Sequence, residues 1–424
     1  MPSYTRTVLS NGLRLILAPQ KDSVATTILV LVEAGSKYET KDINGLSHFL
    51  EHMCFKGTTK RPTAMHIAGE LDGIGAEYNA FTSQEWTGYF VKVQAHKNEQ
   101  ALEIISDLYL HPVFDPAEIE KEKGVIIEEI NMYEDLPPRR VQEIFTQLLY
   151  GDQPAGWDIG GRKEVIRAMT RDHFLKYRGE HYVAQATAIV VAGAFDEEKV
   201  RKGIEAQFKN LSTDKKFGKI ATTEVQSKPE IKLQFKESDQ THVVIGCRAF
   251  DAFDPRRHAL EVLGDILGGG MSSRLFQRVR EQLGAAYYVK AGADLFTDHG
   301  FFAVSSGVEH GKLKIVIQAI LEELQKVATT PVAVHELTRA KEHLSGGLLL
   351  GLETSDSLAN YYGGQEIMRQ DITTPEALLK KIQAVTAEEI QSVAKGMFSN
   401  EKLNMALIGP QKSPNDLQGL LHFS

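Results

Sequence analysis

Hydrophobic residues in the first half of the chain change period along the sequence, and each change marks a different element. Residues 7–17 read as a hairpin around the turn pair Asn11 and Gly12. The apolar, β-branched run 24–34 is typical of a buried strand, whereas apolar residues between 44 and 55 recur at helical spacing. The same patterns predict further helices at 64–74, 97–110 and 116–134, and strand sequence within 78–93.

The second half repeats this order of elements after a polar stretch. Residues 213–228 have no regular period, and we predict a linker there. Strand-like and helical runs then follow in the order of the first half, at 231–235, 242–249, 258–267, 273–282, 285–293 and 300–307. We therefore predict an α+β fold of two similar halves, each a mainly antiparallel sheet covered by helices. The predicted domains are 1–212 and 229–424.

Composition and charge restrict the classes of function. The 424 residues are 42% hydrophobic and 25% charged, which suits two folded domains and argues against a disordered chain. A net charge of −8 and the lack of a dense basic run indicate no nucleic-acid partner. No apolar run reaches the roughly 18–20 residues that span a bilayer, so we expect no membrane insertion. Two widely separated cysteines and no secretory signal pattern predict a cytoplasmic protein.

The predicted helix at 44–55 carries the motif H-x-x-E-H at residues 48–52. Residues four apart lie on one face of a helix, so His48 and His52 can present two imidazole nitrogens to one metal ion. Glu51 stands beside the same face, where a carboxylate can take a proton from a water molecule acidified by zinc. This inverted form of H-E-x-x-H is a known signature of zinc peptidases.

Two histidines leave a zinc site one protein ligand short. The acidic helix predicted at 116–134 is the expected source of the third ligand. Helical spacing alone does not choose between Glu128 and Glu129. It does place Glu122 and Glu129, seven residues apart, on one stripe, where one can ligate the metal while the other holds a histidine.

Several segments together resemble the pitrilysin/insulinase family of inverzincin peptidases, especially its processing-peptidase branch. Residues 45–58 resemble the zinc helix of the family, 79–89 its substrate-pairing edge strand, and 122–130 the helix of the third ligand. In the second half, 273–276 and 280–287 also match. The resemblance covers essentially the whole chain and implies a metallohydrolase fold of the mitochondrial-processing-peptidase type.

The resemblance also assigns roles to the residues of the motif. It implies that His48, His52 and Glu129 bind zinc and that Glu51 is the general base. Glu122 corresponds to the supporting glutamate of the family's catalytic centre.

Substrate contacts are implied by the same resemblance. An extended peptide would add a strand beside the residues of one edge strand, namely Asn79, Ala80, Phe81 and Thr82. Arg280 and Tyr287 correspond to an Arg and a Tyr that contact substrate carbonyls and stabilise the oxyanion. Main-chain hydrogen bonds recognise an extended peptide backbone more than its side chains, so we expect broad cleavage specificity.

The number of metal sites bears on the assembly. Residues 260–267, the second-half counterpart of the zinc helix, contain no histidine, so we expect one zinc ion per chain. Long family members are about twice this length and close around substrate. A chain of this length therefore implies a homodimer, or alternatively a heterodimer with a homologous subunit. The function predicted is a metalloendopeptidase; the alternative is a non-catalytic scaffold or partner subunit of the same family.

Overall fold

The computed structural model describes residues 4–423, which form two compact units. The first unit consists of the described residues up to Asn131, with Trp157–Ile220 and Leu349–Thr373. The second consists of Met132–Gly156, Ala221–Leu348 and the described residues from Thr374 onward. Each unit therefore includes one stretch from the other half of the sequence, which the predicted boundaries at 212 and 229 do not anticipate.

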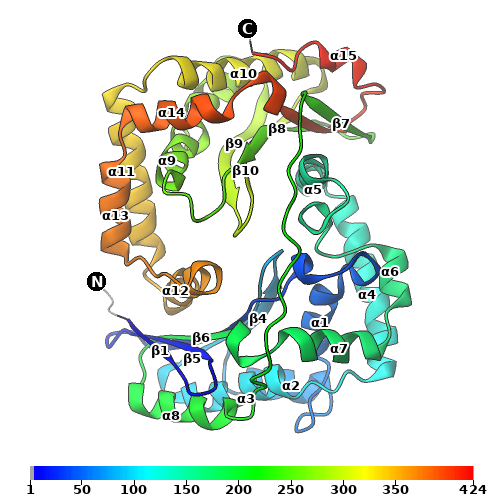
Figure 1. Ribbon diagram of the computed structural model, residues 1–424, viewed down its shortest axis with the longest axis vertical. Coiled ribbons are helices and arrows are strands. Elements are labelled where there is room, and N and C mark those ends of the chain that lie inside the picture. The colour runs from blue at the N-terminus through cyan, green and yellow to red at the C-terminus, as the bar shows by residue number, and fades with distance from the viewer. Residues whose placement is uncertain (1–3, 424) are drawn as a thin grey trace. The chain divides into compact units, whose positions relative to one another are not determined.

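The first unit is built on a six-stranded sheet (Figure 1). Its strands, in spatial order, are β1 (Thr5–Val8), β2 (Arg14–Pro19), β6 (Thr187–Gly193), β3 (Ala25–Val32), β5 (Thr87–Gln94) and β4 (Glu77–Thr82). Only β2 and β6 pair in parallel. The hairpin predicted at 7–17 is present as β1 and β2, with Gly12 at φ +94° in its turn.

The second unit contains a five-stranded sheet with the same topology. Its strands are β7 (Glu230–Phe235), β11 (Asn404–Gly409), β8 (Thr241–Ala249), β10 (Gly300–Val308) and β9 (Ala286–Leu295). Only β11 and β7 are parallel. Apart from β1, each strand of the first sheet has a counterpart at the same place in the second. The prediction of two similar halves with mainly antiparallel sheets is confirmed.

Helices cover both sheets. The first unit contains α1 (Leu46–Cys54), α2 (Ala64–Gly73), α3 (Asn98–Leu110), most of α4 (Pro116–Glu134), α6 (Lys163–Ala168), α7 (Arg171–His181) and α8 (Glu197–Phe208). The second contains α9 (Arg257–Gly268), a π-helix at Phe276–Gln282, α10 (Leu313–Thr329), most of α11 (Val334–Gly351), α13 (Pro375–Ala384), α14 (Ala387–Met397) and α15 (Asn415–Gln418). Among the described residues, no helix combines the length and hydrophobicity that a bilayer crossing requires.

The two remaining helices are exchanged between the halves. From the second half of the sequence, α12 (Ser355–Arg369) covers the face of the first sheet that carries Leu29 and Leu31. From the first half, α5 (Pro137–Tyr150) covers the face of the second sheet that carries Val244. Because strand side chains alternate, the opposite face of each sheet packs against the unit's other helices. Each sheet is thereby buried on both faces.

Candidate metal centre

Helix α1 presents its two histidines on the side opposite its apolar face. Leu46, Phe49 and Leu50 are fully buried against the sheet and neighbouring helices. His48 and His52 point away from that core and keep 15% and 22% of their side-chain surface exposed. The sequence thus orients α1 by its hydrophobic side and leaves the polar side for chemistry.

The N-terminus of α1 is capped by a carboxylate from outside the helix. Glu39 accepts hydrogen bonds from the backbone N–H groups of Gly45 (2.8 Å) and Ser47 (2.6 Å), and from the Asn44 amide (3.0 Å). Its burial raises the pKa of Glu39 to about 7, while these donors act in the opposite direction. Gly45 has φ +100°, and a Cβ there would lie 2.7 Å from the carbonyl oxygen of Gly160.

His48, His52 and Glu129 converge on one point although α1 and α4 are far apart in sequence. The two Nε2 atoms are 3.2 Å apart, and Glu129 Oε2 lies 3.6 Å from each. Atoms bound at about 2.0–2.1 Å to a tetrahedral zinc ion are roughly 3.3 Å from each other. The donor types and the spacing of the three atoms therefore fit zinc. Glu128 is exposed, so the structure separates it from Glu129, which helical spacing alone could not.

Glu122 contacts the ring nitrogen of His52 that faces away from the other ligands, and Lys56 in turn contacts Glu122. The Nδ1 atom of His52 lies 2.9 Å from Glu122 Oε1, and Lys56 Nζ lies 2.6 Å from Glu122 Oε2. Burial of Glu122 opposes its ionisation, but its bonds to His52 and Lys56 prevail and lower its pKa. With a proton on Nδ1 donated to Glu122, the lone pair on Nε2 is left for the metal. The sequence motifs point to Glu122 but not to Lys56, although Lys56 lies inside the matching segment 45–58.

Glu51 lies beside the ligands and is 9% exposed. Desolvation raises its pKa, a bond from Thr82 and the charge of His52 act to lower it, and Glu129 raises it further; the net shift is upward. The Thr82 hydroxyl donates to Glu51 Oε2 at 2.6 Å. A carboxylate with a raised pKa next to a metal site is suited to accept and return a proton.

Helix α4 is fixed at its start by the loop that follows α1. The N–H of Val113 donates to the carbonyl of Gly57 at 3.1 Å, and an isolated β-bridge joins Thr58 to Pro112. Phe114 has a positive φ of 48° and is 1% exposed, and its carbonyl accepts a bond from Arg171 at 3.1 Å. The helix that carries Glu129 thus begins from a tightly held segment.

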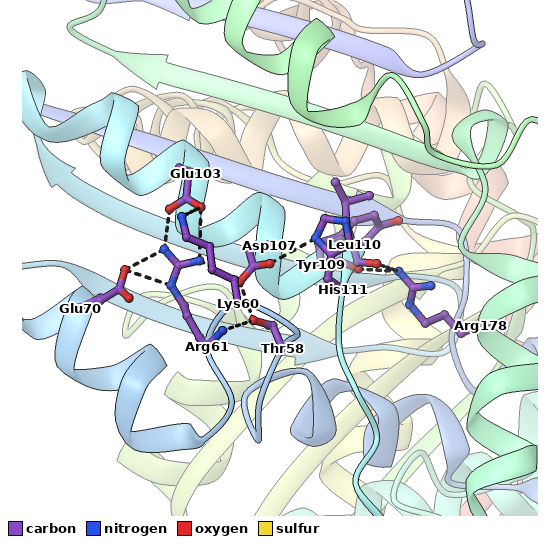
Figure 2. Close-up of polar contacts among 10 residues, drawn as sticks. All are labelled: Thr58, Lys60, Arg61, Glu70, Glu103, Asp107, Tyr109, Leu110, His111 and Arg178. Atoms are coloured by element: carbon purple, nitrogen blue, oxygen red, sulfur yellow. Dashed lines mark hydrogen bonds and ion pairs between the residues drawn. The ribbon is translucent and has the colours of Figure 1, made fainter.

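The same loop is anchored by a buried arginine (Figure 2). Arg61 is 2% exposed and donates to Glu70, Glu103 and Asp107 at distances of 2.5 to 3.0 Å, while Thr58 donates to Asp107 at 2.5 Å. These contacts tie the segment between α1 and α2 to α2 and α3. No sequence motif marks Arg61, because the carboxylates that it contacts lie nine or more residues away along the chain.

The predicted substrate residues fall into two places. Asn79, Ala80, Phe81 and Thr82 lie in β4, the outer strand of the first sheet. Arg280 and Tyr287 belong to the second unit, where Arg280 donates to the Tyr287 carbonyl at 3.1 Å and its guanidinium lies 5.7 Å from the tyrosine ring. The tyrosine side chain is 74% exposed. The pair is therefore assembled and accessible in its own unit.

Comparisons with known proteins agree with this architecture. Residues 15–161 match the family model described as insulinase (peptidase family M16), and 168–344 match the model described as peptidase M16 inactive domain. The chain is 34% identical to an uncharacterized zinc protease, YmxG, of Bacillus subtilis over 96% of this chain and 98% of the relative. It is also 34% identical to an uncharacterized zinc protease of Rickettsia felis, covering 97% and 98%.

Solved structures show the same fold. A protease from Helicobacter pylori has a TM-score of 0.89 at 20% identity, covering 96% of this chain and 100% of that one. A Pseudomonas fluorescens structure described as a peptidase M16 inactive domain also has a TM-score of 0.89, at 18% identity, covering 97% and 99%. At these identities the likeness concerns the fold, and the two-unit architecture is common to all three chains.

Proposed function

This chain belongs to the insulinase family of peptidases, family M16, and we propose that it is a zinc-dependent endopeptidase acting on extended or unfolded peptides. The observation that carries the proposal is the convergence of His48, His52 and Glu129 from two helices, with Glu51 beside them. These donors would hold one zinc ion per chain.

The residues around the site divide the chemistry between them. A zinc ion in this position supplies Lewis acidity, which acidifies a water molecule and polarises the scissile carbonyl. Glu51 takes the proton from the attacking water and returns it to the leaving amine. Glu122, itself held by Lys56, keeps the His52 ring in one orientation and one tautomer.

Substrate would bind beside β4 as an additional strand. As the outer strand of its sheet, β4 can offer main-chain groups to a peptide, and its end is next to Glu51. Arg280 and Tyr287 would contact substrate carbonyls from a partner subunit, most simply in a homodimer, with a heterodimer as the alternative. The non-catalytic role considered for the whole chain is better suited to the second unit, whose residues 221–344 fall within the match to the inactive-domain model, a match that begins at residue 168 in the first unit.

Metal analysis together with one substitution tests the proposal. We expect purified protein to contain one zinc per chain and to cleave an unstructured peptide. Glu51→Gln should retain zinc but lower kcat by roughly 10²–10⁴-fold, the usual contribution of a general base. Glu128→Gln is the matched control, because Glu128 is exposed and one residue from a ligand. Peptide cleavage by Glu51→Gln at the wild-type rate, or a protein without metal, would show that the chain is not a zinc peptidase.

A further inference from the structure

The side chain of Thr82 faces the metal centre, not the outer edge of the sheet. Residues two apart in a strand share a face. Tyr78 and Ala80 pack into the core cluster that contains α1, whereas Phe81 packs into the cluster on the opposite face with α12. Thr82 therefore belongs to the face of α1, and its hydroxyl donates to Glu51 Oε2 at 2.6 Å.

The position of Thr82 is set by the hairpin that it closes. Thr82 pairs with Thr87 across β4 and β5, and the N–H of Ser83 donates to the carbonyl of Trp86 at 2.9 Å. On the other face, the Phe81 ring lies so close to Gly88 that a Cβ there would come within 2.3 Å of it. The packing of the Phe81 ring against Gly88 and the closed turn after Thr82 restrict the movement of the Thr82 hydroxyl.

Glu51 needs such a donor. A carboxylate that is 9% exposed has lost most of its water, and a hydrogen bond to the charged form restores part of the stabilisation. The bond from Thr82 also restricts which oxygen is directed toward the point where the ligands converge. A general base that is free to rotate would spend less time in reach of the attacking water.

We propose that Thr82 is a positioning residue whose hydroxyl holds the Glu51 carboxylate in place for proton transfer. The inference rests on the proposed peptidase function and assigns to the Thr82 side chain a role separate from main-chain pairing with substrate. One residue would then connect the strand that receives the peptide to the group that activates water.

Two substitutions separate this role from a structural one. Thr82→Val keeps the shape and the strand propensity but removes the donor, and Thr82→Ser restores the donor. For the zinc-loaded enzyme and a quenched peptide, we expect Thr82→Val to lower kcat by roughly 10- to 100-fold, the effect of one hydrogen bond to a charged group. KM and zinc affinity should change less than about 2-fold, and Thr82→Ser should recover most of kcat. Thr59→Val, an exposed threonine in the loop after α1, is the control.

Crystal structures of the metal-free variants provide a readout without activity. The Glu51 carboxylate should leave its place in Thr82→Val and keep it in Thr82→Ser. If wild-type protein cleaves no peptide, the proposed function fails, while these structures still test the hydrogen bond. A rise in KM with unchanged kcat, no recovery by Thr82→Ser, or an unmoved Glu51 in Thr82→Val would each overturn the inference.

Discussion

The two units make the same kind of contact between equivalent helices, but among the described residues only the first unit adds further donors that converge on one point. In the first unit, α1 and α4 are joined by His52 Nδ1 and Glu122 Oε1 at 2.9 Å. In the second, α9 and α11 occupy the same places in the order of elements, and Asp265 Oδ1 and His343 Nδ1 join them at 2.6 Å. The histidine and the carboxylate have changed helices. Each unit therefore joins these two helices by a His–carboxylate contact, whether or not further metal-binding side chains lie beside it.

What distinguishes the first unit is the set of donors around that contact. It adds His48 on α1 and Glu129 on α4, and the three donor atoms lie within 4.8 Å of one another. In the described part of the second unit, no group of three such side chains comes together. The connector before α1, residues 33–45, is also longer than its counterpart 250–256, and it contains the buried Glu39 that caps the helix. The candidate metal site thus depends on side chains that the first unit adds to a fold shared by both units.

The largest expected effect follows from removing one of these added donors. Glu129→Gln replaces an anionic ligand with a neutral amide, so zinc affinity should fall by more than the roughly 10- to 100-fold typical of a supporting residue. Peptide cleavage should be lost with the metal. His343→Ala removes the His–carboxylate contact of the second unit and should leave zinc content unchanged. Chelator competition measures both variants, and zinc loss in His343→Ala would contradict the distinction between the units.

The loops after the two equivalent helices provide the next comparison. Arg61 follows α1 and is 2% exposed, with Asp107 as a buried partner at 7%. Arg274 follows α9 and pairs with Glu336, both 17% exposed. Arg61→Met should destabilise the first unit by about 3–5 kcal/mol, because it removes the guanidinium from the buried Asp107 carboxylate, which then keeps only the contacts of Thr58 and His111. Arg274→Met should cost about 1 kcal/mol or less, because its partner keeps contact with water.

Tryptophan fluorescence can show whether the loss of stability in Arg61→Met occurs in the first unit. Both tryptophans, Trp86 and Trp157, lie in the first unit. In urea unfolding of the metal-free protein, Arg61→Met should lower the midpoint reported by fluorescence, and Arg274→Met should leave that midpoint nearly unchanged. Equal shifts for the two variants would mean that the buried arginine gives the first unit no special stability.

The sequence predicts some of the elements and site residues of the two units but not others, and the physical reason differs from residue to residue. Hydrophobic period and turn residues are local, so they predict α1, the hairpin at 7–17 and the repeated order of elements. The H-x-x-E-H spacing places two ligands on one helix face, and the family resemblance selects Glu129. Lys56 and Arg61 act through carboxylates that the fold brings close. Glu39 caps a helix that begins only a few residues after it, but no motif marks this contact.

The positions of α5 and α12, the two helices exchanged between the halves, also could not be predicted from local sequence. The apolar stripe of α5 predicts a helix with one buried face but does not say which sheet covers it. In the first sheet, which is built from the same half of the sequence as α5, the face that carries Leu29 and Leu31 is covered by α12. Ala359 and Tyr362 of α12 are fully buried against it. Boundaries drawn from the linker at 213–228 follow the chain, whereas the compact units follow the packing.

The smallest expected effect concerns Glu39, the buried carboxylate that caps α1. Burial raises the pKa of Glu39 from 4.5 to about 7, and its carboxyl faces Tyr177 as well as its donors. A group with a raised folded-state pKa stabilises the fold fully below pH 4.5 and loses that contribution as the pH rises through 7. The stability of metal-free wild type relative to Glu39→Gln should therefore decline between pH 5 and 8, by at most about 1.4 kcal/mol per pH unit. Urea midpoints at several pH values measure this difference, with the exposed Glu197→Gln as control. A constant difference over that range would mean that Glu39 keeps one charge state, and its contribution to α1 would then be the same at every pH.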